Sequence, residues 1–231
     1  MPRRLTFENA RDLCKQRADI ENDRHIQPAE LAAMMSSAYG AVYQKVAASG
    51  GRYWESTYSI TADGSASYPE PDDHLSTIGL DLVRADGTRC PLKPLPIQHR
   101  HRFAGRTGEA RRYMLIDSAL ILFPKPSSGA YEMLYIPQAP DLKTYADSDL
   151  IDVVTPDGEE MFIWGTVVKI LAKKEQDPRL AITERDAAAE RLLEWATMRS
   201  LVDGPVRVVE DTEDDLADIN GSWNPASWRY R

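Results

Sequence analysis

The sequence predicts an α+β fold: a helical bundle of about four helices with an inserted antiparallel β meander and an extended C-terminal arm. Apolar residues recur at helical spacing in two separate parts of the chain. The part between them is rich in Tyr, Ile, Val and Thr, and the last segment has no regular apolar pattern. The predicted parts are an N-terminal helix pair at 1–52, a β domain at 53–150, C-terminal helices at 151–202 and the arm at 203–231.

Two amphipathic helices are predicted at the start of the chain. From Thr6 to Ile20, apolar residues at spacings of three and four form one stripe. A second helix begins at Pro28, which suits a first helical turn, and its stripe continues until Gly50-Gly51. Because the link between them is short, we expect these helices to form an antiparallel pair.

A β meander is predicted from Tyr53 onward. Asp63-Gly64, Asp86-Gly87, Asp117-Ser118 and the Ser-Ser-Gly at 127–129 provide residues that favour turns, either through positive φ or through local side-chain hydrogen bonds. The segments between them have β-branched and aromatic composition, which is typical of strands. The strands are expected near residues 54–61, 76–84, 111–116, 119–124 and 130–136.

Prolines add two expectations about the β domain. The run from Leu120 to Pro126 leads through a Pro and Gly turn toward Tyr131 and Tyr135, which predicts a hairpin. Prolines also cannot donate to a β ladder, so the stretch that contains three of them is expected to be an edge strand or an extended loop. These prolines are Pro91, Pro94 and Pro96.

Two further helices are predicted after the β domain. Thr155 can cap free amides, Pro156 fits a first turn, and Glu159 and Glu160 meet the positive helix end. Apolar residues cover more than one face of this helix, which predicts a central position with neighbours on several sides. Another helix starts at Asp177-Pro178 and ends near residue 201.

Composition limits the classes of function. The chain has 231 residues, a formal net charge of −8 and a pI near 5.1, which argues against a sequence-independent nucleic-acid binder. Cys14 and Cys90 are too few for a disulfide framework, and no apolar run near residue 1 resembles a signal peptide, so synthesis in a reducing cytoplasm is expected. The most apolar stretch, Met161 to Ala172, is too short for a membrane span.

One basic cluster stands out in this acidic chain: His99, Arg100, His101 and Arg102. The favoured interpretation is a solvated or subunit-facing patch, and contact with phosphate or an acidic partner is the alternative. The two histidines lack the spacing and the cysteine support of a zinc site, so no metal and no cofactor are predicted.

No catalytic residues are predicted. The sequence contains no Gly-x-Ser-x-Gly nucleophile elbow and no phosphate-binding glycine loop. A glycosidase-like pair of carboxyl groups stays open, because such a pair depends on geometry and not on composition.

The last segment combines acidic and aromatic character. Residues 210–218 hold six acids, and residues 219–231 hold none. Two interpretations stay open: the aromatic end folds back on its own domain, or it is an arm that becomes ordered on a neighbouring chain. Trp, Tyr and Arg are the residue types most enriched at binding hot spots. The candidates are Trp223, Trp228, Arg229, Tyr230 and Arg231.

The order of these features, from Phe7 to Glu210, resembles the head-to-tail adaptor proteins of tailed bacteriophages. The resemblance rests on the opening helix pair, on several short motifs in the middle, and on the acidic tail. Those motifs are Tyr68-Pro69 with Asp72-Asp73, Leu120 to Pro126 with Tyr131 and Tyr135, Asp147 to Asp152, Lys174-Glu175 with Asp177, and Asp203-Gly204-Pro205.

The resemblance implies a non-enzymatic virion protein made in the host bacterial cytoplasm and located at the virion neck. Twelve copies would form a homo-oligomeric ring that joins the portal protein to tail or nozzle proteins, with DNA passing through without sequence-specific binding. The aromatic end at 219–231 would bind the portal, and 99–102 would lie at a subunit or partner interface. Two alternatives stay open: another tail component, such as a tube or nozzle subunit, and a virion-associated peptidoglycan-degrading enzyme.

Overall fold

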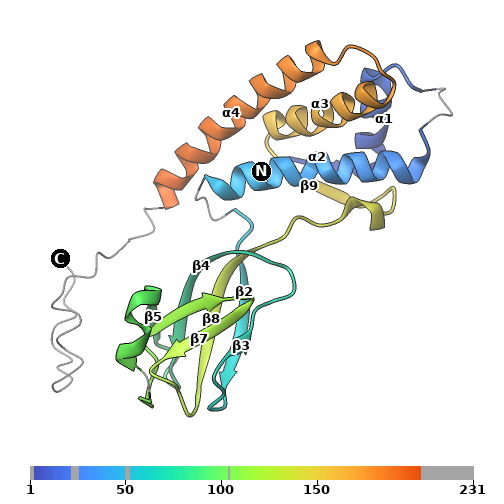
Figure 1. The fold of residues 1–231 in the computed structure, drawn as a ribbon. Coiled ribbons are helices and arrows are strands. Elements are labelled where there is room, and N and C mark those ends of the chain that lie inside the picture. The colour runs from blue at the N-terminus through green and yellow to red at the C-terminus, as the bar shows by residue number, and fades with distance from the viewer. Residues whose placement is uncertain (1–2, 22–25, 50–52, 104, 204–231) are drawn as a thin grey trace.

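The computed structural model describes residues 3–21, 26–49, 53–103 and 105–203. It shows an α+β fold with a helical part and a β part, joined by two connections (Figure 1). The helical part contains α1 (Phe7–Arg17), α2 (Pro28–Ala48), α3 (Pro156–Lys173) and α4 (Arg179–Asp203). The predicted C-terminal arm starts at Asp203, which is the last residue of α4, and its other residues, 204–231, lie outside the described residues.

All four predicted helices are present, and their starts follow the local signals. The Thr6 hydroxyl accepts a hydrogen bond from the amide of Asn9, which caps α1. The Thr155 hydroxyl accepts one from the amide of Gly158 at 3.0 Å, and Pro156 occupies the first turn of α3. These caps satisfy amides that the helices themselves leave free.

Helix α3 is the centre of the helical core, as predicted from its apolar faces. It contacts α1, α2 and α4, and Figure 1 shows α4 inclined to α2 and α3. Phe162, Ile163, Val167 and Ile170 are fully buried, and the Phe162 ring meets the Tyr39 ring edge to face. Helices α1 and α2 pack mainly on α3 and touch each other only slightly, so the expected opening pair is held together through α3.

An ion pair joins α1 to α3 at the edge of this core. Arg17 donates from Nη1 and Nη2 to the two carboxylate oxygens of Glu160 at 2.5 and 2.7 Å, and its guanidinium lies over the ring of Trp164. The hydrogen bond from Arg17 lowers the pKa of Glu160. Because the folded pKa is the lower one, this stabilisation is present above the unfolded pKa and is lost as pH falls through the folded value.

We therefore expect Arg17→Met to reduce stability more at pH 7 than at acidic pH. The loss at pH 7 should stay below about 1 kcal/mol, since both side chains are partly exposed to solvent. Urea unfolding of both proteins at a series of pH values between neutral and acidic measures the difference. Arg179→Met is the matched control, because Arg179 is almost fully exposed and should change little at any pH. A pH-independent loss in Arg17→Met would contradict the assignment.

The β part is a curved seven-stranded sheet with the order β2-β8-β4-β5-β6-β7-β3. All five predicted strands are present: β2 (Ser56–Ala62), β4 (His74–Val83), β6 (Arg112–Ile116), β7 (Ala119–Phe123) and β8 (Gly129–Pro137). The strands not predicted are β3 (Tyr68–Pro69), β5 (Arg89–Pro94), and the pair β1 (Arg3–Thr6) and β9 (Leu150–Val154), which forms its own two-stranded sheet.

Two predictions about strand neighbours are wrong. The sheet is mixed and is not a simple antiparallel meander, because β8 lies between β2 and β4, and β5 pairs with β6 in parallel. The predicted hairpin between Leu120 and Tyr135 is also absent, since β7 pairs with β6 and β3, whereas β8 pairs with β2 and β4. The hairpin that does form joins β6 to β7 through Asp117 and Ser118, which both have positive φ.

Strand β5 lies inside the sheet although it contains Pro91 and Pro94, so its expected edge position is wrong. Its first four residues pair only with β4, and its last two pair only with β6. Each proline therefore has a ladder partner on one side only, which is the condition that an edge strand normally provides.

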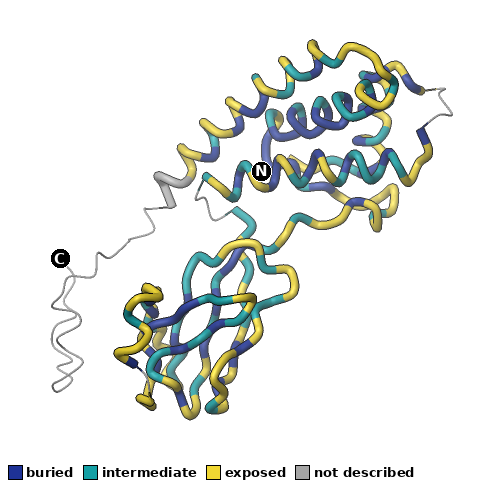
Figure 2. Tube along the Cα trace, viewed as in Figure 1, coloured by how far each residue is buried: buried dark blue, intermediate teal, exposed yellow. Residues whose placement is uncertain are grey.

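Two separate clusters of buried residues hold the protein together (Figure 2). The β cluster includes Tyr131, whose hydroxyl accepts a hydrogen bond from the amide of Ala110 at 3.2 Å. The helical cluster extends toward the β part through Ile78 and Ile136. Tyr43 on α2 stacks on Trp54, with 3.8 Å between ring centroids, where the chain enters the β part. These contacts fix the sheet beneath the helices.

Candidate functional site

The sheet has a gap where β5 ends between β4 and β6. Strand β4 pairs with β8 along its whole length but with β5 only at 80–83. Strand β6 pairs with β7 along its whole length but with β5 only at 112–113. Residues 74–79 of β4 and 114–116 of β6 therefore have a strand neighbour on one side only. We call the space between these two segments the β4–β6 groove.

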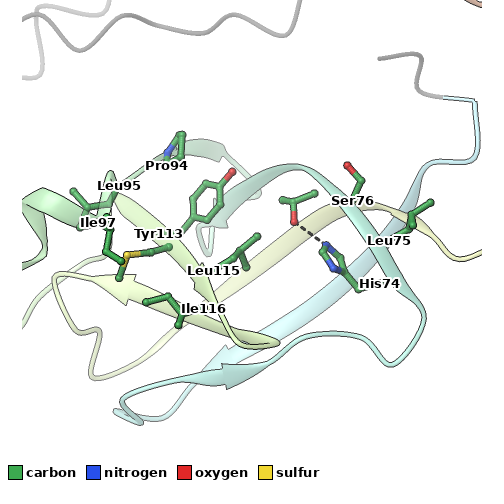
Figure 3. A pocket seen from close by; sticks show the side chains of 11 residues that line it. His74, Leu75, Ser76, Pro94, Leu95, Ile97, Tyr113, Leu115 and Ile116 are labelled. Carbon is green, nitrogen blue, oxygen red and sulfur yellow. Dashed lines mark hydrogen bonds between the residues drawn. The ribbon is translucent and has the colours of Figure 1, made fainter. Parts of the chain in front are cut away.

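The β4–β6 groove is a hollow of about 590 Å³ with mainly apolar side chains around it (Figure 3). Leu75 comes from β4, Leu115 and Ile116 come from β6, and Ile97 follows β5. Ile97 is 62% exposed and Leu75 is 38% exposed, which is unusual for large apolar residues beside a sheet. Its full lining is His74, Leu75, Ser76, Thr77, Pro94, Leu95, Ile97, Tyr113, Met114, Leu115 and Ile116.

His74 at one end of the groove is held from both ring nitrogens. Its Nδ1 lies 3.1 Å from a carboxylate oxygen of Glu70, and its Nε2 lies 2.8 Å from the hydroxyl of Thr77 (Figure 3). The Tyr135 hydroxyl donates to Asp73 at 3.0 Å close by. These contacts hold the imidazole at the groove wall.

The predicted basic cluster forms a 3₁₀ helix, η1 (Ile97–Phe103), whose first residue lines the groove. Arg100, His101 and Arg102 are exposed, and His99 is half-buried. The sequence therefore identified a surface cluster correctly, and the fold adds that it lies beside the β4–β6 groove. Its assignment to a subunit or partner interface stays a prediction.

Exposed arginines extend this basic surface toward β6. Arg106 and Arg111 are exposed, and like Arg100 and Arg102 they have no carboxylate partner among the residues that the structure describes. Arg89 on β5, by contrast, has a carboxylate partner, because it donates to Glu132 at 2.5 Å. We call Arg100, Arg102, Arg106 and Arg111 the open arginines.

The described residues show no grouping that suggests a metal site or an activated nucleophile. No cluster of three or more potential metal ligands occurs in the described part of the chain. Burial raises the pKa of the Cys14 thiol to about 12, which disfavours the reactive thiolate. Hydrogen bonds at turns, from Ser65 to Asp63 and from Thr88 to Asp86, lower the pKa of both carboxyl groups, as expected of structural turns.

The other predicted site residues cannot be placed. The five residues proposed for portal binding, between Trp223 and Arg231, lie outside the described residues. Sequence reasoning missed the β4–β6 groove. Ile97 was the one local signal, because it follows three closely spaced prolines, which interrupt any helical or strand pattern that would bury it.

The groove offers backbone and apolar contacts and the open arginines offer charge, which are features of surfaces that bind other polypeptides. The chain belongs to the SU10 adaptor protein family, whose model matches residues 9–213. The resemblance to phage head-to-tail adaptors is thereby confirmed, and the family is one of structural components of the bacteriophage virion. No individual curated protein matches the chain. Among the described helices, none has the length and apolar character of a membrane span.

Proposed function

We propose that the protein forms a ring, with twelve copies, at the virion neck, where it joins the portal to tail or nozzle proteins and continues the DNA conduit. The family match is the observation that carries this proposal, because it spans both the helical and the β parts. The protein is non-enzymatic in this role. Its aromatic C-terminal residues contact the portal, and residues 99–102 lie at a subunit or partner boundary.

The charge of the chain supports a conduit. Each copy has a formal net charge of −8, so a ring of twelve copies has a total formal charge of roughly −100. A ring of this sign repels passing phosphates, so DNA can move through it without being held. A ring also requires a heterologous contact, in which one patch on a subunit meets a different patch on the next. The open arginines are one such patch.

Electron microscopy of the purified chain mixed with assembled portal tests the proposal. We expect a ring of density on one end of the portal, with the rotational symmetry of the portal and the β part of each subunit resolved. The chain alone and the portal alone are the controls. Stacked tubes formed by the chain without portal would contradict the proposal and favour the tube-subunit alternative, which polymerises through sheet edges.

A further inference from the structure

We propose that residues 206–215 of a neighbouring copy enter the β4–β6 groove and form a strand between β4 and β6. This inference rests on the proposed ring, and it names the contact that joins one subunit to the next. Residues 99–102 then belong to the subunit boundary, and the aromatic residues at 219–231 stay free to reach the portal.

The groove lacks one strand of backbone pairing. Strand β5 pairs first with β4 and then with β6, and it leaves the sheet after Pro94. Beyond that point, no described strand pairs with the inner edges of 74–79 and 114–116. Both edges therefore offer free backbone groups, and an extended segment placed between them can hydrogen-bond to them.

The side chains of the groove require an apolar occupant. Leu75 and Ile97 are the most exposed large apolar residues of its lining and lie at opposite ends of the view in Figure 3. An extended segment that runs the length of the groove can cover apolar surface at both ends. The chain contains a short β-branched run just after α4, with Val206, Val208 and Val209. Such residues fit a pleated and half-buried surface.

Charge complementarity supports the same pairing of residues 206–215 with the β4–β6 groove. Acidic residues follow the valines directly, at Glu210, Asp211, Glu213, Asp214 and Asp215. The open arginines lie on η1, which begins in the groove, and on the approach to β6. A segment with valines in the groove therefore places its carboxylates beside arginines that have none in the described chain, and complementary charges fix such a register.

The two patches are different, which suits a contact between copies. A groove on one subunit and a segment on the next form a heterologous interface, and such interfaces close into rings. Only Gly204 and Pro205 separate Val206 from the end of α4. At about 3.5 Å per residue, the neighbouring groove must then lie within roughly 10 Å of that helix end.

Disulfide trapping between two full-length variants tests the inference. One chain carries Ile97→Cys, the other carries Val208→Cys, and both carry Cys90→Ser so that the partly exposed native thiol cannot react. Because the two introduced cysteines are on different chains, a disulfide between residues 97 and 208 reports a contact between two copies and not a contact within one. The control pairs Val208→Cys with Thr183→Cys, because Thr183 is exposed on α4 and away from the groove.

We expect the yield of the Ile97→Cys and Val208→Cys pair to be roughly tenfold higher than that of the control pair. Adding Arg100→Glu and Arg102→Glu to the Ile97→Cys chain should lower this yield severalfold at low salt. Yields equal to the control would overturn the inference. So would a chain with both cysteines that closes only on itself, because the segment would then occupy its own groove.

Trapping and microscopy together distinguish a failure of the strand contact from a failure of the proposed neck function. If trapping equals the control while microscopy shows a ring on the portal, the strand contact is wrong and the proposed function stands. If trapping succeeds and no ring forms on the portal, the contact between copies stands and the neck function is wrong.

Discussion

A chain that lacks Ile219 to Arg231 is expected to lose binding to assembled portal and to keep its helical and β cores. The deleted residues lie outside the described helical and β parts and include the aromatic and arginine anchors of the proposed docking segment, Trp223, Trp228, Arg229, Tyr230 and Arg231. Such anchors concentrate the binding energy of an interface, so the loss should be nearly complete. Sedimentation of the chain with portal rings measures binding, and circular dichroism measures the fold.

A milder variant separates the anchors from the length of the arm. Trp223→Ser with Trp228→Ser keeps every residue position. At about 2 kcal/mol for each lost hot spot, it should weaken binding by between roughly 30-fold, for one hot spot, and roughly 1,000-fold, for two that add. The matched control is Asn220→Ser with Asn224→Ser, which changes the same segment without removing an aromatic ring and should bind as before. Portal binding that survives the full deletion would refute the role of the arm.

The helices could be predicted because their signals are local. At α3, a capping threonine, a first-turn proline and acids at the positive end all lie within a few residues of Thr155. The α+β class follows from the same local reading. The short strand β1 was missed because its partner, β9, lies about 150 residues away and the sequence of Arg3–Thr6 has no strand pattern of its own.

The positions of five strands could be predicted from the sequence, but the strands with which they pair could not. β-branched composition predicts where a strand forms, whereas pairing depends on contacts between distant segments. The connection from Leu95 to Arg111 crosses the sheet so that β6 runs parallel to β5, and no local residue signals that crossing. The proline rule failed at β5 for a related reason, since it assumes one partner along the whole strand.

The same distinction applies to the candidate site. The basic cluster at 99–102 is visible in the composition of a few consecutive residues, so its exposure could be predicted. The β4–β6 groove exists only because β5 ends at Pro94 while both of its neighbours continue. Its lining comes from three segments that the sequence does not relate to one another.

Gly158→Ala is expected to destabilise the protein strongly, although alanine normally favours helices over glycine by about 1 kcal/mol. Gly158 lies in the first turn of α3, and a Cβ there would stand 2.0 Å from the carbonyl oxygen of Val153. That oxygen belongs to backbone held by β9, and Val153 itself is fully buried. The chain must therefore shift around the helix start, and we expect the free energy of unfolding to fall by about 3 kcal/mol.

Gly40→Ala is the matched control for this substitution. Gly40 also lies within a helix, α2, but a Cβ there meets no atom within 4 Å. Because no clash opposes the substitution at Gly40, only helix propensity changes, and the free energy of unfolding of this variant should rise by about 0.5 to 1 kcal/mol. Urea unfolding of the three proteins measures both changes. If Gly158→Ala were as stable as Gly40→Ala, the close approach of the start of α3 to β9 would be wrong.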